Sequence, residues 1–185
     1  MSEIFHCVLT NDHSKLQLLL TTSPEWVDIM DENGDTPLMV ASKLGHVKCV
    51  QTLISNGADV LHVNRTGLNA LTMAALSGSV MTMSNLLKVT SMEHYMKMSL
   101  VPPLVAAIFG GHADAVDFLM QFHTPLSKTV TREGNSPLML SIMFDRSDVT
   151  DLFSDEPGFL KNALGMTASD ITEYKQTFMT RSSSD

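Results

Sequence analysis

The chain has 185 residues, a formal net charge of −8 at pH 7 and an apolar content of 44%, which suits one domain or a short stack of repeated units. Nucleic-acid binding is disfavoured, because phosphate contacts need clustered Lys and Arg and the sequence has no basic run. Membrane insertion is disfavoured as well, because no apolar run approaches the roughly 18 residues of a membrane span.

Two short helices are predicted near the N-terminus, over residues 2–11 and 14–21. Apolar residues recur at helical spacing in both segments, and the polar run Asn11–His13 separates them. Pro24 follows the second segment and ends its helical pattern. We therefore expect residues 1–30 to form a helical capping repeat that has no hairpin of its own.

A turn followed by two helices is predicted for residues 31–63. The run Asp31–Gly34 has turn chemistry, and Gly34 can adopt a positive φ. Thr36 is a good N-cap, and Pro37 suits the first helical position because the N–H that it lacks would have no helical partner there. Gly45 is placed to end the first of the two helices.

The same pattern returns at a fixed interval along the chain. One shift along the sequence places Gly34 on Gly67, Leu38 on Leu71, Ala41 on Ala74 and Gly45 on Gly78. Self-similarity at one period indicates a stack of like units, in which each unit packs against its neighbours. The predicted units are 31–63, 64–96, 97–130 and 131–163.

The last two of these units are degenerate. The first helix of the third unit starts at Pro102-Pro103 without a side-chain cap, and Leu100 replaces the turn glycine, so we expect a distorted hairpin there. In the fourth unit Leu152 matches Leu53, which is on the apolar face of its helix. The run Asp155–Gly158 should end the second helix of this unit early.

The C-terminal part is predicted to close the stack. Residues 164–180 are expected to form a partial capping repeat with a helix from about residue 168 to 178. Ser169 occupies the position of Leu38, which fits the polar outer face that a terminal unit needs. The tail, 181–185, is expected to be disordered.

The repeated unit resembles the ankyrin repeat. The segments GDTPL (34–38) and GAD (57–59), with the small Ala41 between them, carry the resemblance, which extends over roughly residues 3–178. It implies an all-α-dominated ankyrin-repeat solenoid of antiparallel helix pairs with short hairpin loops. The histidine of the family's Thr-Pro-Leu-His segment, which helps to tie units together, is absent from every unit, so lower stability is expected. Its positions hold Met39, Thr72, Val105 and Met139.

No grouping with catalytic specificity is found: the chain has no phosphate-binding glycine loop, zinc-protease motif or nucleophile elbow. His46 and His112 share one repeat position, at which the family has a structural turn histidine. Cys7 and Cys49 fit neither a metal spacing nor a disulfide framework. We expect Cys49 to be a buried, inert thiol, whereas Cys7 could react more readily although nothing in the sequence activates it. We expect no enzyme activity, no metal and no cofactor.

A partner surface is implied by the resemblance, because ankyrin stacks present a concave face of hairpin tips and first-helix surfaces. In the middle units the outward positions are unusually apolar and have charged neighbours, which is typical of a protein interface. In the alternative interpretation, the third unit is distorted and Val101 and Phe109 turn into the core. The predicted partner-binding residues are Asp35, Lys43, Leu44, Arg65, Leu68, Leu76, Met98, Val101, Phe109, Arg132 and Glu133.

The resemblance implies an intracellular protein–protein interaction module, an adaptor or scaffold that binds a protein or peptide on this concave face. The second hypothesis is a stand-alone inhibitor or regulator of a partner enzyme or transcription factor. The acidic opening Met1-Ser2-Glu3 does not resemble a secretory signal peptide. We therefore expect a cytoplasmic monomer, with the nucleus as the alternative compartment.

Overall fold

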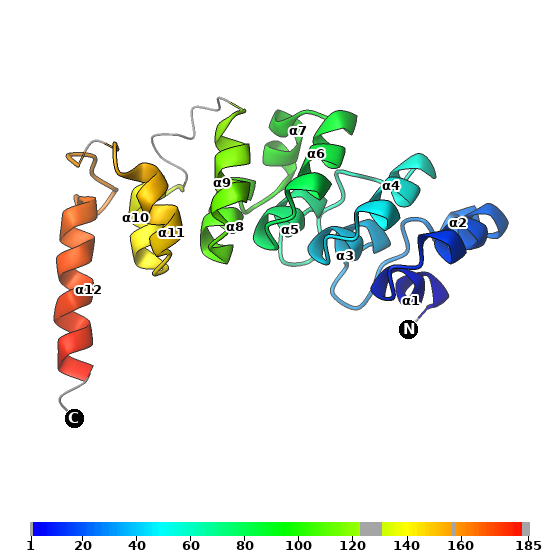
Figure 1. Cartoon of the computed structure of the whole chain (residues 1–185), viewed down its shortest axis with the longest axis horizontal. Coiled ribbons are helices and arrows are strands. Elements are labelled where there is room, and N and C mark those ends of the chain that lie inside the picture. Colours follow the sequence, from blue (N-terminus) through cyan, green and yellow to red (C-terminus); the bar gives the residue numbers. More distant parts are fainter. Residues whose placement is uncertain (1, 123–130, 157, 183–185) are drawn as a thin grey trace.

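The structure is a computed structural model that describes residues 2–122, 131–156 and 158–182. Over these residues it consists of helices and connecting turns, with one isolated β-bridge between Val63 and Asn69. Helix pairs follow one another in a row from the N-terminal to the C-terminal end (Figure 1). The predicted all-α-dominated solenoid of antiparallel helix pairs is therefore confirmed.

Two layers of helices form this row. The first helices of successive pairs are α1 (Glu3–Leu9), α3 (Pro37–Lys43), α5 (Ala70–Leu76), α8 (Pro103–Gly110) and α10 (Pro137–Met143). The second helices are α2 (His13–Thr22), α4 (Val47–Ser55), α6 (Val80–Val89), α9 (Ala113–Met120) and α11 (Ser147–Thr150). Each first helix packs on the next first helix, and each second helix packs on the next second helix.

The first helices begin where the sequence predicts. The Thr36 Oγ1 accepts the N–H of Met39 at 3.3 Å, and the Asn69 Oδ1 accepts the N–H of Thr72 at 2.9 Å. The helix that starts at Pro103 has no side-chain cap, as expected. Each cap pairs one of the N–H groups that a helix start leaves without an internal partner.

Small side chains lie where neighbouring first helices meet. Ala41, Ala74, Ala107 and Ser141 occupy equivalent positions in α3, α5, α8 and α10, and all four are fully buried. Because these side chains are short, the helix backbones can approach closely and leave little empty space. One apolar core runs through the stack from Ile4 to Phe153, and a second, smaller cluster of Met139, Ala168 and Ile171 lies between α10 and α12.

Left-handed turns connect the two helices of each pair. Gly45, Gly78 and Gly111 have φ of +67°, +73° and +77°, and Asn11 and Asp145 adopt the same conformation with φ of +56° and +55°. Asn and Asp are the residues other than glycine that tolerate this region best. The reversal between helices is thus kept in every unit, although glycine is not.

The junction between the second and third units differs from the others. An additional helix, α7 (Met92–Met98), stands there, and its Tyr95 is fully buried. Leu100 is not left-handed, and its N–H donates to the Gly67 carbonyl at 2.9 Å. The expected distortion of this hairpin is therefore confirmed, and its form is a helix that packs into the core.

The fourth unit corrects one prediction. Helix α11 continues as a short 3-10 helix, Asp151–Phe153, and the second helix ends before Asp155 as expected. Leu152, however, is 47% exposed, whereas Phe153 is buried. The prediction that Leu152 lies on the apolar face, from its match to Leu53, is wrong because the larger Phe153 side chain takes the buried place in the core at the end of this helix.

The C-terminal helix α12 (Ala168–Ser182) packs on α10 and so takes the place of a first helix in a closing unit. Ser169 is exposed, which fits the predicted polar outer face. The helix extends beyond residue 178, so the prediction of disorder is wrong for residues 181–182. Residues 183–185 and the end of the predicted 97–130 unit (123–130) lie outside the described residues, and the unit boundaries stay predictions.

Leu71→Asp should lower the free energy of unfolding by about 4 kcal/mol or more, because it places an unpaired carboxylate in the core. Leu71 is fully buried in α5. The control is Leu18→Asp on α2, where the side chain is 66% exposed and a change below about 1 kcal/mol is expected. Thermal denaturation followed by circular dichroism measures both, and an unchanged midpoint for Leu71→Asp would contradict this packing.

Gly78→Ala should destabilise the chain more than Gly57→Ala. Both glycines have a positive φ, of +73° and +85°, but an added Cβ on Gly78 would lie 2.6 Å from the His112 ring, whereas Gly57 has no atom within 4 Å. We expect about 1 kcal/mol for Gly57→Ala from backbone strain alone and about 2 to 3 kcal/mol for Gly78→Ala. Urea denaturation of the two variants gives the difference, and equal losses would argue against the close contact.

Candidate partner-binding surface

A stripe of side chains crosses the first helices near their C-terminal ends. Leu9, Lys43 and Leu76 end α1, α3 and α5, and Phe109 and Met143 lie at the equivalent places in α8 and α10. We call these five residues the first-helix stripe. Phe109 is 50% exposed, Leu9 and Met143 are 44% exposed, Lys43 is exposed and Leu76 is half-buried. Four of the five are apolar, and all of them reach the surface.

Sequence reasoning predicted the middle of this stripe and missed its two ends. Lys43, Leu76 and Phe109 are separated by the repeat interval itself, whereas the steps from Leu9 to Lys43 and from Phe109 to Met143 are longer. An extra residue in the first and last intervals moves both ends out of the common register. Aligning the helix ends, rather than a fixed period, would have found them.

Phe109 lies on the surface and is held in place from one side. Its ring meets the Phe144 ring edge to face, with centroids 5.0 Å apart and an angle of 83° between the planes. The guanidinium of Arg146 donates two hydrogen bonds to the Phe109 carbonyl, at 3.0 and 2.8 Å. The backbone and one ring edge are therefore fixed, and half of the side chain stays open to a partner.

The other apolar residues of the predicted surface fall into two groups. Leu44 is 44% exposed directly after α3, and Met98 is 53% exposed at the end of α7. Leu68 and Val101 are half-buried and pack against the core. The alternative interpretation, in which Val101 and Phe109 turn into the core, thus applies in part to Val101 but not to Phe109.

Asp35 is not an open rim residue, which corrects its predicted place. It is 9% exposed, and its carboxylate accepts a hydrogen bond of 2.6 Å from the Asn64 amide of the next hairpin. The carboxylate is buried because it joins two hairpins. Arg65, Arg132 and Glu133 are exposed, as is Lys43.

Neighbouring hairpins are joined through their backbones. The Arg65 N–H donates to the Asn33 carbonyl at 3.2 Å, and the Ala163 N–H donates to the Glu133 carbonyl at 2.7 Å.

The pKa of the Glu133 carboxyl lies below its ordinary value. The larger cause is a hydrogen bond from a backbone N–H, and the smaller one is a hydrogen bond from the Thr131 hydroxyl. Glu133 is therefore a fixed negative charge at neutral pH.

The histidines of the turn position have structural contacts. A ring nitrogen of His46 is 2.8 Å from the Val8 carbonyl oxygen of the preceding pair, and the His112 ring lies against Gly78. Among the described residues, no three His, Cys, Asp or Glu side chains gather closely enough to hold a metal ion. Within the same part of the chain, no helix is both long and apolar enough to cross a bilayer.

Both cysteines are fully buried in the core as free thiols. Burial raises the pKa of the Cys7 thiol and raises the pKa of the Cys49 thiol to about 11. The thiolate is the nucleophilic form, so both groups are inert in the folded chain. The more reactive role considered for Cys7 from its place near the terminus does not fit this burial.

A hollow opens near each end of the stack. One, of about 780 Å³, lies at the N-terminal end between α1, the segment 29–33 and α3. The other, of about 550 Å³, lies at the C-terminal end between α10, α11 and α12. Apolar residues are in the majority around the first hollow, whereas nearly all residues around the second are polar.

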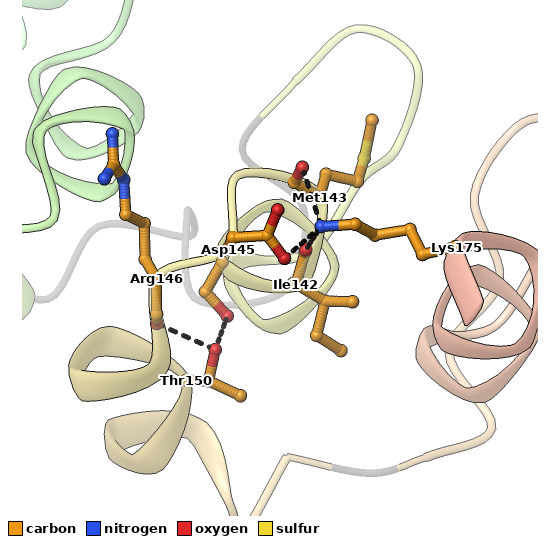
Figure 2. Close-up of polar contacts among 7 residues, drawn as sticks. Ile142, Met143, Asp145, Arg146, Thr150 and Lys175 are labelled. Carbon is orange, nitrogen blue, oxygen red and sulfur yellow. Dashed lines mark hydrogen bonds and ion pairs between the residues drawn. The ribbon is translucent and has the colours of Figure 1, made fainter. Parts of the chain in front are cut away.

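The C-terminal hollow is a junction between helices (Figure 2). Lys175 reaches from α12 to the end of α10, where its ammonium donates to the Ile142 carbonyl at 2.8 Å, to the Met143 carbonyl at 3.4 Å and to the Asp145 carboxylate. These carbonyls belong to the helix end that favours a cation. The Lys175 side chain thus joins α12 to the end of α10.

Comparison with known proteins agrees with this geometry. Residues 4–98, about half of the chain, match the family model described as ankyrin repeats (3 copies). The chain is 29% identical over 119 residues to "DNA replication inhibitor plutonium" of Drosophila melanogaster, which is 62% of this chain and 68% of that protein. It is 39% identical over 75 residues to human "NAD-capped RNA hydrolase NUDT12", which is 40% of this chain and 16% of that protein.

A solved crystal structure has the same fold. The human ASB11 ankyrin repeat domain superposes with a TM-score of 0.71 and 21% identity, over 92% of this chain and 91% of that one. At this identity the likeness establishes the fold alone. The match to the hydrolase spans a small part of that protein, so no enzymatic activity is indicated by it.

Neither thiol should react with Ellman's reagent in the native chain at pH 8, because both are buried and protonated. In urea both should react at the rate of a free cysteine. Counting released thionitrobenzoate before and after denaturation measures this. Fast labelling of one native thiol would contradict the burial of that residue.

Stability should also depend on Cys49 at alkaline pH. Its pKa is raised from an ordinary value near 9 to about 11, so the folded state keeps a proton that the unfolded state loses between these values. The contribution of the protonated Cys49 thiol to the free energy of unfolding is complete below about pH 9 and is lost as the pH rises through 11. The free energy of unfolding should therefore fall more steeply over this range for the wild type than for Cys49→Ala, in which other titrating groups are unchanged. Parallel pH profiles would contradict it.

Proposed function

This chain belongs to the ankyrin repeat family, whose repeats are generally protein–protein interaction modules, and from this premise we propose that it is an adaptor that binds a protein or peptide segment on the surface formed by its hairpins and first-helix stripe. The observation that carries the proposal is the half-exposed Phe109, whose ring contacts Phe144 and which lies in a stripe with four apolar members out of five.

Binding on such a surface needs little rearrangement. The Phe144 ring and the Arg146 guanidinium fix Phe109 before any partner arrives. An anchor that is already ordered saves the entropy that a mobile side chain would lose on binding. Large aromatic side chains at the centre of an interface contribute most of its binding energy.

Charged side chains belong to the proposed surface as well. Lys43, Arg65, Arg132 and Glu133 are exposed, and so are the apolar residues Leu44, Met98 and Phe109. Charges at the rim add little affinity but select a partner of complementary charge and speed its association. Leu68, Leu76 and Val101 support this surface from beneath, because they are half-buried against the core.

A stand-alone inhibitor or regulator is the second candidate. It is favoured by the similarity to the Drosophila protein named as a DNA replication inhibitor, 68% of whose length is matched. An inhibitor differs from an adaptor because a single partner suffices, and mixing the two purified proteins would lower the partner's activity. In both cases we propose a non-catalytic, monomeric protein of the cytoplasm or nucleus. We also propose that it binds no nucleic acid, and the net charge of −8 supports this part of the proposal.

Phe109→Ala should weaken binding of a partner by roughly 10- to 100-fold while the helical circular dichroism stays unchanged, because the residue is an anchor and not part of the core. Affinity capture from an extract followed by titration of the captured partner measures the loss. Phe159→Ala is the matched control, since Phe159 is 78% exposed and lies outside the surface. Unchanged binding by the folded Phe109 variant would contradict the proposal, and loss of helicity would place Phe109 in the core.

A further inference from the structure

The hollow at the N-terminal end has an apolar floor that continues the first-helix stripe. Its apolar lining consists of Phe5, Leu9, Ile29, Met30 and Val40, which come from α1, the connecting segment and α3. Met30 is 60% exposed and Leu9 is 44% exposed. A volume of about 780 Å³ is within the range of sites that enclose a small ligand or several side chains. We call this site the N-terminal hollow.

A hydrogen-bond donor stands unused beside this floor. At two later hairpins, the residue after the start donates its N–H to the preceding hairpin: Arg65 donates to the Asn33 carbonyl, and Ala163 donates to the Glu133 carbonyl. Glu32 is the equivalent residue of the first hairpin, because the shift that places Gly34 on Gly67 places Glu32 on Arg65. Its N–H has no acceptor among the described residues. The backbone of the first hairpin therefore offers the edge on which a further extended segment would lie.

The rim of the N-terminal hollow is acidic. Asp31 and Glu32 line it, and neither forms an ion pair with a described residue. The Asp31 carboxylate is fixed by the N–H groups of Asn33 and Asp35, at 2.8 and 2.9 Å. Between Lys15 and Lys43 the sequence has five acidic residues and no Lys or Arg. In the described part of the chain, the one Lys or Arg bonded to this hairpin is Arg65 of the next hairpin. Its guanidinium donates to the Glu32 carbonyl at 2.7 Å.

We infer that the N-terminal hollow binds an extended peptide segment of a partner protein that has one large apolar side chain and a Lys or Arg a few residues from it. The apolar side chain fills the floor, a backbone carbonyl of the segment accepts the Glu32 N–H, and the basic residue pairs with Asp31 and Glu32. The inference rests on the proposed binding function and specifies the chemistry of the partner.

An extended segment fits these features better than a helix does. A helix uses its backbone carbonyls in its own hydrogen bonds, so it has none to offer to Glu32 along its length. An extended segment keeps its carbonyls free and sends alternate side chains to opposite sides, which allows one to enter the floor. The acidic rim then selects segments with basic residues and disfavours acidic ones.

The test is a selection of short random peptides displayed on phage, with the folded full-length chain as the target. Bound peptides are sorted on the double variant Leu9→Ser, Met30→Ser and on the control Leu18→Ser, Met81→Ser. The control pair is also exposed, at 66% and 63%, but lies on α2 and α6. Peptides that fail on the first variant only should carry a large apolar residue next to Lys or Arg.

Charge reversal tests the rim. Glu32→Lys should weaken these peptides by about tenfold or more at low salt, because it replaces an attraction by a repulsion. Glu173→Lys is the matched control on α12, where Glu173 is exposed. Peptides that depend on the hollow but lack basic residues would overturn the inference, as would the absence of any peptide that depends on it.

Magnetic resonance tests the backbone contact independently of any variant that fails to fold. Addition of a selected peptide to the ¹⁵N-labelled chain should shift the Glu32 amide resonance and slow its hydrogen exchange. A shift of the Leu9 and Met30 methyl groups without any change at the Glu32 amide would overturn the extended pairing.

The two proposals fail separately. Peptides that need Phe109 but not Leu9 or Met30 would support the binding module and overturn only the N-terminal hollow. Peptides that need the hollow but not Phe109 would keep this inference and overturn the stripe as the main surface. Selected peptides that tolerate both sets of variants would overturn both.

Discussion

The close approach of neighbouring first helices is the constraint on which the structure depends. Ala41, Ala74, Ala107 and Ser141 are fully buried between these helices, so each backbone can come near the next one. A longer side chain at one of these positions would push two units apart and open the core that runs from α1 to the last short helix. The left-handed turns serve the same contact, since the turn at Gly78 leaves room for the His112 ring of the following unit.

The partner surface is a product of this stacking. Because the first helices lie side by side and end at the same level, the residues at their ends fall into one line. Polar residues in this first-helix stripe would be enough to keep the stack soluble, yet four of its five members are apolar. Phe109 is the most fully supported of them, since the next unit provides both the Phe144 ring and the Arg146 guanidinium.

The two ends of the stack are covered by different elements. At the C-terminal end, α12 covers α10, and Lys175 joins the carbonyls at the end of that helix to α12. At the other end, α1 covers α3, but among the described residues no hairpin precedes the first one. The apolar floor, the free Glu32 N–H and the acidic rim all follow from that uncovered edge.

The sequence by itself determined the period, the helix starts and the turns, because a cap such as Thr36 or a left-handed glycine such as Gly45 acts over a few residues. It also predicted Lys43, Leu76 and Phe109 on one surface. Only the tertiary structure decided that α7 replaces a hairpin, that Asp35 pairs with Asn64, and that Phe153 rather than Leu152 is buried. Each of these depends on which residues meet when the units pack together, and the local pattern of the sequence does not encode such contacts.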